Sequence, residues 1–305
     1  ATTEIYTLSL RDALPISTDV ARAGWDEALA GALGGRPVTR VICTHMHPDH
    51  IGLAGWLCAR FGAPLLMSRT EYVTARMLIG DEVLGPPADA EAFYRAAGWT
   101  DEQIARWRDG YGGFGRMVQD FPREYRRVQE GEVLSLGGED WRVVVGEGHS
   151  PEHVCLWREK DGVFIAGDQI LPRISSNISI WPTEPQADPL GDWLWSLAAL
   201  KERLPGDLLV LPSHGEPFYG VTLRLEALMR GHEVALKRLE KTLRTPCRAV
   251  DVFGALFARP VGDAVLGMAT GEALAHLNYL ERQGRVRRVR DEGGVDWWSL
   301  LETGQ

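Results

Sequence analysis

The hydrophobic and polar positions of residues 39–67 predict two short buried strands with a helix between them. Residues 39–43 end in the apolar run Val41-Ile42-Cys43, which predicts a strand, and residues 49–61 follow a helical pattern. Residues 62–67 predict a turn and the second strand. The polar segment 44–50, THMHPDH, lies where the first strand passes into the helix. A loop of this kind can direct its side chains into a cavity.

The pattern after residue 130 predicts a sheet with two long helices. Residues 132–136 and 141–145 alternate around Gly137-Gly138, which predicts a β-hairpin. Three further apolar runs predict buried strands, at residues 154–157, 163–166 and 208–211. Residues 190–204 and 221–243 have the spacing of amphipathic helices. A long loop, residues 168–189, precedes the first of these helices.

Two regions depart from this strand-rich pattern. Residues 70–118 predict three helical pieces, broken near Gly85 and Gly98, and we interpret them as a helical insert. The many aromatic residues of the insert fit a layer that covers the core, or the wall of a substrate pocket. Residues 248–305 predict two helices, 250–257 and 264–283, followed by a basic hairpin, an order that resembles a winged-helix module.

The sequence predicts a hydrolase-like domain over residues 18–247 and a winged-helix-like domain over residues 248–305. Residues 1–17 resemble the conceptual translation of a sequencing adapter. We therefore interpret them as a non-native segment and exclude them from the functional argument. A genuine N-terminal strand is the alternative.

Charge and composition bear on which partners the protein can bind and on where in the cell it is expected. The net charge of −9 argues against general affinity for nucleic acid. The basic hairpin invites a DNA-binding interpretation, but residues 271–279 offer almost no basic side chains, so packing or a homodimer contact is the default. Apolar runs are too short for a membrane span. The four scattered cysteines and the lack of a signal-peptide pattern predict a reducing, cytoplasmic location.

Potential metal ligands follow four of the predicted strands. His45, His47, Asp49 and His50 lie within six residues, and imidazole and carboxylate groups together are typical zinc ligands. Three more candidates stand just after later strands: His149, Asp168 and His214. Strand ends of a layered sheet can meet at one rim, so these side chains are expected to converge. Five histidines and two aspartates suffice for two metal ions that share a carboxylate.

The motifs THMHPDH, GHSPEH, GD and a late SH resemble those of the metallo-β-lactamase superfamily, across about residues 19–243. The resemblance implies an α+β fold, the four-layer αββα sandwich. In that family several strands precede the first motif and commonly end in a DTG-like turn. Here Thr18-Asp19 is all that stands between the adapter-like segment and the first helix, so we expect those strands to be missing and a sheet edge to be exposed.

The resemblance also implies roles for individual residues. His45, His47 and His149 would hold the first of two zinc ions. Asp49, His50 and His214 would hold the second, and Asp168 would bridge them. Iron or manganese are alternatives to zinc. His153 matches a position that supports the ligands without binding metal, and Asn177 and Tyr219 are candidates for contact with substrate.

These roles predict a hydrolase, of the kind that acts on ester bonds. A metal-bound hydroxide would attack the carbonyl of an ester, a hydroxyacylglutathione-like thioester or a lactone, with Asp49 orienting the nucleophile. The metal cluster is net positive, so we expect a small anionic substrate.

Other functions remain open at this stage. A phosphodiesterase or ribonuclease of the same superfamily is one alternative, and an iron-dependent persulfide-dioxygenase-like enzyme is another, although His214 favours a second metal. A flavodiiron oxidoreductase is disfavoured, since that motif usually has Glu at the position of His47. A binding module with a vestigial site is disfavoured by the complete ligand set.

Overall fold

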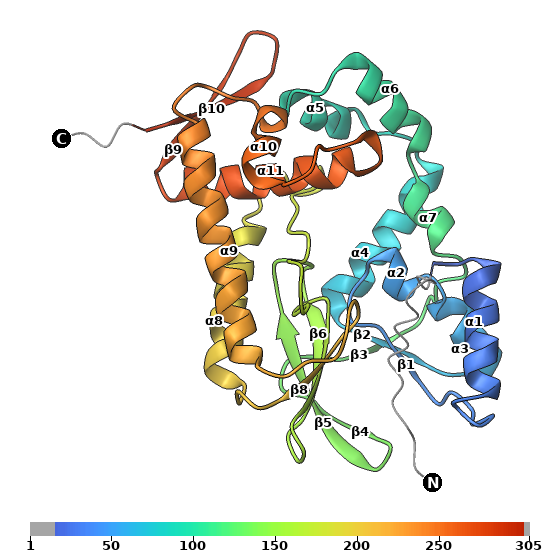
Figure 1. The fold of residues 1–305 in the computed structure, drawn as a ribbon. Helices are drawn as coiled ribbons and strands as arrows, with labels where there is room; N and C mark the ends of the chain where they lie inside the picture. The colour runs from blue at the N-terminus through green and yellow to red at the C-terminus, as the bar shows by residue number, and fades with distance from the viewer. Residues whose placement is uncertain (1–15, 302–305) are drawn as a thin grey trace. The chain divides into compact units, whose positions relative to one another are not determined.

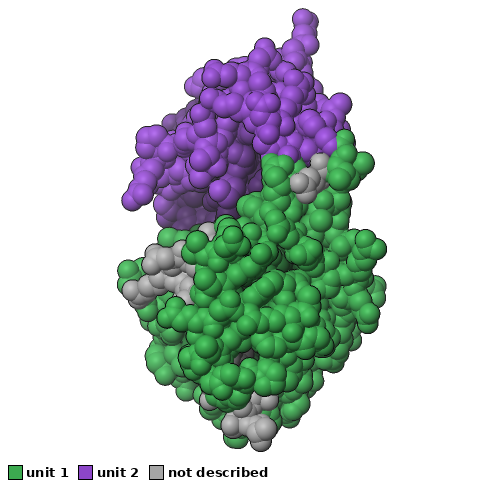
Figure 2. Space-filling model, turned by 90° about the vertical axis from the view of Figure 1, so that its right-hand side faces the viewer, with its two compact units in different colours: residues 1–84, 112–176, 201–224 green, residues 85–111, 177–200, 225–305 purple. Residues whose placement is uncertain are grey.

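The computed structural model describes residues 16–301, which form two compact units (Figures 1 and 2). Of the described residues, unit 1 comprises 16–84, 112–176 and 201–224, and unit 2 comprises 85–111, 177–200 and 225–301. All but the last two residues of the adapter-like segment 1–17 lie outside the described residues. The units follow spatial contacts rather than chain order, so the sequence-based domain boundaries stay a prediction.

The first sheet of unit 1 has three parallel strands in the order β1 (Val41–Ile42), β2 (Leu65–Met67) and β3 (Arg126–Arg127). The sequence predicted β1 and β2 but not β3, because two exposed arginines carry no hydrophobic signal. Within the described residues β1 pairs only with β2, so its other edge has no strand partner there.

The period of two along β1 and β2 sends alternate side chains to opposite faces of this sheet. Val41, Leu65 and Met67 join a core with the helices of unit 1, whereas Ile42 and Leu66 face the second sheet. These helices lie on the outer face of the first sheet (Figure 1): α1 (Asp19–Ala30), α2 (Pro48–Ile51), α3 (Ala54–Phe61), α4 (Arg69–Gly80) and α7 (Gly113–Met117). The short 3₁₀ helix η1 (Asp81–Val83) follows α4.

One detail of this helical layer differs from the sequence prediction. The single helix predicted over residues 49–61 is two helices, α2 and α3, which are separated at Gly52-Leu53. The first helix, α1, begins at Asp19, where the Thr18 hydroxyl accepts a hydrogen bond from the Ala21 amide, 3.2 Å away. Such an N-cap typically contributes about 1 kcal/mol.

The second sheet of unit 1 has five strands, which confirm the predicted pattern: β4 (Val133–Leu136), β5 (Glu139–Gly146), β6 (His153–Arg158), β7 (Val163–Gly167) and β8 (Leu209–Pro212). The strands lie in chain order. Neighbours are antiparallel from β4 to β7, and β7 and β8 are parallel. The parallel pair requires a crossover, which the chain makes through the long loop and the helix predicted after residue 168.

The two sheets pack face to face over a second apolar core. Trp141, Val143, Val154 and Leu156 from the second sheet surround Leu66 from the first. Each of these side chains is at least 95% buried, and burial of one large apolar side chain is worth about 1.5–3 kcal/mol. This core holds the strand ends of both sheets in fixed positions.

Unit 2 is mainly helical. Its elements are α5 (Ala88–Ala96), α6 (Asp101–Gly110), most of α8 (Pro189–Arg203) and α9 (Val221–Thr242), η2 (Ala249–Val252), α10 (Phe253–Leu256), η3 (Asp263–Val265), α11 (Leu266–Arg282) and the antiparallel hairpin β9 (Val286–Arg290) and β10 (Asp296–Leu300).

The C-terminal helices and hairpin therefore occur where they were predicted, and the winged-helix likeness stays a prediction. Residues 69–117 contain four α-helices rather than the expected three pieces, with the additional break near Gly112. The predicted α+β class is confirmed. Within residues 16–301, no helix is long and apolar enough to cross a membrane.

Candidate metal centre

The topology of unit 1 brings the candidate ligands to one rim. Because β7 and β8 are parallel, Asp168 and His214 follow them at the same edge of the second sheet. Strands β5 and β6 are joined at this edge by the loop that carries His149. The loop after β1 meets this edge, since the Val154 amide donates to the carbonyl of Thr44, 2.7 Å away.

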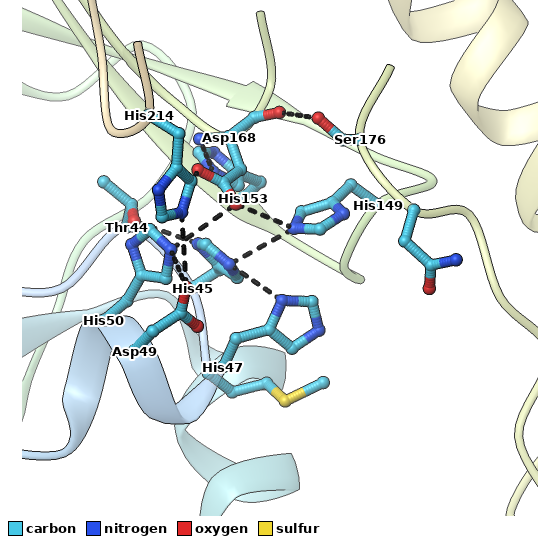
Figure 3. Close-up of polar contacts among 12 residues, drawn as sticks. Thr44, His45, His47, Asp49, His50, His149, His153, Asp168, Ser176 and His214 are labelled. Atoms are coloured by element: carbon cyan, nitrogen blue, oxygen red, sulfur yellow. Dashed lines mark hydrogen bonds and ion pairs between the residues drawn. The ribbon is translucent and has the colours of Figure 1, made fainter. Parts of the chain in front are cut away.

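Three ring nitrogens form the first group of potential ligands. The Nε2 atom of His45 lies 3.0 Å from Nδ1 of His47 and 3.3 Å from Nε2 of His149. Figure 3 shows the three rings pointing toward one another. Thr44 places the first ring, since its hydroxyl lies 3.0 Å from Nδ1 of His45. With Nδ1 as the donor in that bond, His45 turns the lone pair of Nε2 toward the other two rings.

The second group combines imidazoles with carboxylates. Asp49 stands in the first turn of α2, and its Oδ2 atom lies 3.4 Å from Nε2 of His50 and 3.2 Å from Nε2 of His214. Asp168 lies 3.5 Å from His50 and 3.6 Å from His214. The side chains of Asp49 and His214 keep 27% and 36% of their surface exposed, so solvent reaches this group.

Asp168 also connects the two groups. Its Oδ2 atom, 3.5 Å from Nε2 of His50, lies at the same distance from Nε2 of His149 in the first group. Within each group the potential ligand atoms all lie within 4.8 Å of one another. The structure thus brings together all seven residues singled out from the sequence, in the division expected there.

The spacing fits metal ions better than direct contacts. Ligands at 2.0–2.1 Å around a tetrahedral ion lie about 3.3–3.4 Å apart. The observed separations of 3.0–3.6 Å scatter around that value. Nε2 of His50 and Oδ1 of Asp168 are buried and make no hydrogen bond. Among the described residues, both atoms have only the ion-pair contacts of 3.4–3.6 Å described above. Buried polar atoms without a hydrogen bond are rare and costly, so this arrangement fits a bound cation.

Burial and neighbouring charges set the protonation states of His45, His47 and Asp168. Burial lowers the pKa of His45 well below its usual value and lowers that of His47 to about 3. Burial also disfavours the charged form of Asp168. The contacts with His149 and His50 have the larger effect, and they hold the pKa of that carboxyl well below its usual range. Neutral imidazoles beside ionised carboxylates are the forms that bind metal.

His50 and His214 behave differently in the absence of metal. Burial opposes the charge of His50, yet the contacts with Asp168 and Asp49 raise its pKa to about 9. The hydrogen bond with Asp49 likewise raises the pKa of His214. A proton on these rings takes the place that a cation would take between the carboxylates, so metal and protons compete for this group.

His153 supports Asp168 rather than joining either group. It is fully buried as the first residue of β6, and its Nε2 atom accepts a hydrogen bond of 3.0 Å from the Asp168 amide. Gly167 allows this approach: its φ is +53°, and a Cβ atom there would lie 2.4 Å from Cε1 of His153. The Ser176 hydroxyl donates to the carbonyl of Asp168.

The structure shows other contacts for the two residues that were predicted to touch substrate. The Asn177 amide group donates to Glu272, 2.7 Å away, and its carbonyl accepts from the Ser179 hydroxyl at 2.5 Å. Tyr219 is 69% exposed. Their substrate roles stay predictions.

Glu71 was missed by the sequence analysis. Its side chain is fully buried in α4, and it accepts backbone hydrogen bonds from Met46 and Glu152. A single glutamate in a helix is normally read as solvent-facing, so no local signal could have identified it.

Two family models and a bacterial relative match the sequence of this chain. A model of the metallo-beta-lactamase superfamily matches residues 16–214, and one of the metallo-beta-lactamase-like C-terminal domain matches residues 236–301. The Bacillus subtilis (strain 168) protein named "Probable metallo-hydrolase YqjP" is 26% identical over 293 residues, which cover 92% of this chain and 86% of that protein.

Solved structures show the same likeness. The crystal structure of a beta-lactamase domain protein from Burkholderia ambifaria has a TM-score of 0.86 and 37% identity, covering 94% of this chain and 82% of the other. A metallo-beta-lactamase family protein from Thermus thermophilus has a TM-score of 0.76 and 28% identity, covering 94% and 88%. The chain therefore belongs to the metallo-beta-lactamase superfamily, as a metallo-hydrolase with a candidate metal-binding cluster of histidines and aspartates.

Proposed function

We propose that this chain is a dinuclear metal-dependent hydrolase that cleaves an ester, thioester or lactone bond in a small anionic substrate. Zinc is the metal that the ligand set fits best, with iron or manganese as alternatives. His45, His47 and His149 would hold one ion. Asp49, His50, His214 and the shared Asp168 would hold the other.

The observation that carries this proposal is the position of Asp168 between the two groups. A carboxylate offers two oxygens and can therefore serve two ions at once. Its Oδ2 atom lies 3.5 Å from His149 and its Oδ1 atom lies 3.6 Å from His214. A structural ion pair would need one partner, whereas Asp168 faces imidazoles from three separate loops or helices.

The bound ions, Asp49 and the residues around Asp168 would have different roles in the reaction. The bound ions would supply Lewis acidity, which activates water and polarises a carbonyl near neutral pH. Asp49 is held ionised by His214 and His50 despite its burial, because they keep its pKa well below the usual range. Its carboxylate can therefore accept a hydrogen bond from the attacking water and orient it. His153 and Ser176 hold the backbone of Asp168 on both sides.

Charge supports the choice of substrate class. Two divalent ions outweigh the charges of Asp49 and Asp168, so the loaded centre is net positive even though the whole chain carries −9. Opposite charge raises the local concentration of a substrate and its association rate. An anionic ester or thioester is favoured over a neutral one for this reason.

Turnover by the metal-depleted and reloaded protein tests the proposal. We expect no hydrolysis after chelation and recovery with Zn²⁺, Mn²⁺ or Fe²⁺, on a panel of anionic thioesters, lactones and phosphodiesters. Neutral analogues of each substrate are the matched controls. Activity on phosphodiesters alone would replace the proposal with the nuclease alternative. Oxygen-dependent turnover of a persulfide with iron would replace it with the dioxygenase alternative.

A further inference from the structure

We propose that Glu71 is a positioning residue, which fixes the separation of the two loops that carry the first group of ligands and thereby sets the affinity of that group for metal. The inference rests on the proposed metal centre. It concerns a residue that lies outside both groups of ligands and belongs to helix α4.

The two carboxylate oxygens of Glu71 hold one loop each. Oε2 accepts a hydrogen bond from the backbone amide of Met46 at 2.8 Å, and Met46 stands between His45 and His47. Oε1 accepts one from the amide of Glu152, also at 2.8 Å, in the loop that carries His149. The loops are far apart in sequence, so the carboxylate acts as a bridge between them.

A second hydrogen bond joins the loop of His45 and His47 to strand β6, which directly follows the loop of His149. The Val154 amide donates to the carbonyl of Thr44, 2.7 Å away. One connection alone would let the two segments rotate relative to each other. Two connections fix their relative orientation as well as their distance. Ligand atoms must be held within a few tenths of an ångström to bind an ion well.

Helix α4 gives the bridge a rigid base. The Ser68 hydroxyl donates to the carbonyl of Glu152 at 2.7 Å, and the Thr70 amide donates to the carboxylate of Glu152 at 2.6 Å. The start of α4 is thus fastened to the His149 loop by three hydrogen bonds, including that of Glu71. Glu71 extends this attachment to the loop of His45 and His47.

The chemistry of the contact requires a carboxylate. Glu71 is fully buried, and a buried charge is tolerated only when hydrogen bonds compensate for lost hydration. Burial raises the pKa of the Glu71 carboxyl, and the two backbone N–H donors aimed at its two oxygens oppose that rise. Bonds to an ionised acceptor are stronger than neutral ones. Glutamine has the same shape but one acceptor oxygen, so its NH₂ group would face one of the two N–H donors.

The test compares Glu71→Gln with Tyr72→Phe. Tyr72 is the next residue of α4, and its hydroxyl donates to the carbonyl of Pro122 at 3.0 Å, away from both loops. Each variant loses one side-chain hydrogen bond from the same helix, so Tyr72→Phe measures what general loosening of α4 does. Zn²⁺ or Co²⁺ is titrated against a competing chelator, and hydrogen exchange of the Met46 and Glu152 amides is followed in the metal-free protein.

We expect two binding steps in the unaltered protein. Glu71→Gln should weaken one step about 10- to 100-fold and leave the other unchanged, in the range typical of residues that orient metal ligands. One or both of the two amides should exchange faster, and Tyr72→Phe should change neither binding step.

Three results would overturn the inference. These are wild-type affinity at both steps in Glu71→Gln, equal weakening of both steps, and equal weakening by Tyr72→Phe. Absence of two steps in the unaltered protein would instead refute the proposed dinuclear function, so the two failures are distinguishable.

Discussion

Unit 1 and unit 2 each contain a cluster of buried histidines, and the two clusters differ in what surrounds them. In unit 2, Nδ1 of His232 lies 3.2 Å from Nε2 of His276, whose Nδ1 atom donates to the carbonyl of Glu272 at 2.8 Å. Burial lowers the pKa of His232 to about 3 and that of His276 to about 4. Both rings are therefore neutral and hydrogen-bonded within the core.

The rings of unit 1 face carboxylates instead. Asp168 and Asp49 raise the pKa of His50 to about 9 against the effect of burial. The positions of the residues differ as well. His232 and His276 lie inside the long helices α9 and α11, whereas most candidate ligands lie in loops at strand ends and His50 lies in the four-residue helix α2. The comparison teaches that buried histidines alone do not indicate a metal site. The candidate site of unit 1 is distinguished by the carboxylates and strand ends that converge on it.

The largest effect is expected from Asp168→Asn, which keeps the shape of the carboxylate that links the two groups. Loss of its charge should remove metal from both groups. Turnover should fall by more than about 100-fold, since residues that only orient ligands already cost 10- to 100-fold. Metal analysis and steady-state kinetics measure the two effects. Retention of two ions and full activity would contradict the bridging role.

A smaller effect is expected from Thr44→Val, which removes the oxygen beside Nδ1 of His45. The ring then loses the partner that fixes its tautomer, and metal affinity should fall about tenfold. Competition titration with a chelator measures this change. Thr44→Ser keeps the hydroxyl and serves as the matched control, and equal affinities in the two variants would show that the contact has no orienting role.

The pH dependence of metal uptake tests whether His50 is protonated in the metal-free protein, unlike the neutral histidines of unit 2. His50 has a pKa of about 9 in the metal-free protein, above the ordinary 6.5, so it is protonated at pH 7.5. Metal uptake there should release about one proton from this ring, and the release should decline as the pH rises through about 9. Calorimetric titrations in two buffers of different ionisation enthalpy measure it. His50→Gln should abolish this component, and an unchanged release would refute the assignment.

The same shift has a consequence for the metal-free fold. A pKa raised by folding means that the charged ring stabilises the folded state. This contribution is complete below about pH 6.5 and is lost as the pH rises through about 9. Urea denaturation of the metal-free protein at several pH values follows it, with His50→Gln as the control that lacks the dependence.

The smallest effect on metal is expected in unit 2. His276→Ala removes a buried ring from α11 and should lower the free energy of unfolding by about 1–3 kcal/mol. Metal stoichiometry should remain that of the unaltered protein, because His276 belongs to neither group of ligands. Denaturation and metal analysis of the same sample check both statements. Loss of metal from this variant would erase the distinction between the two clusters.

The convergence of the candidate ligands could be predicted because each one follows a strand that the local sequence pattern reveals. His45, His149, Asp168 and His214 each follow an apolar strand that period-two burial makes recognisable. The strands β4 to β8 and the C-terminal hairpin were predicted within a few residues for the same reason. The division into two ligand groups came from the resemblance to a family and not from the spacing alone.

Other features could not be predicted because they depend on contacts distant in sequence. Strand β3 consists of two exposed arginines that only their partner strand β2 makes into a strand. Glu71 reaches two loops that lie 25 and 81 residues away. The interruption at Gly52-Leu53 between α2 and α3 is a further feature that the helical pattern of residues 49–61 did not predict.

The metal content of the purified chain tests the central claim most directly. After equilibration with Zn²⁺ and removal of loose ions, elemental analysis and anomalous X-ray scattering from crystals would count and locate the bound ions. We predict two ions per chain, one among His45, His47 and His149 and one beside Asp49, with Asp168 between them. One ion or none under these conditions would contradict the account.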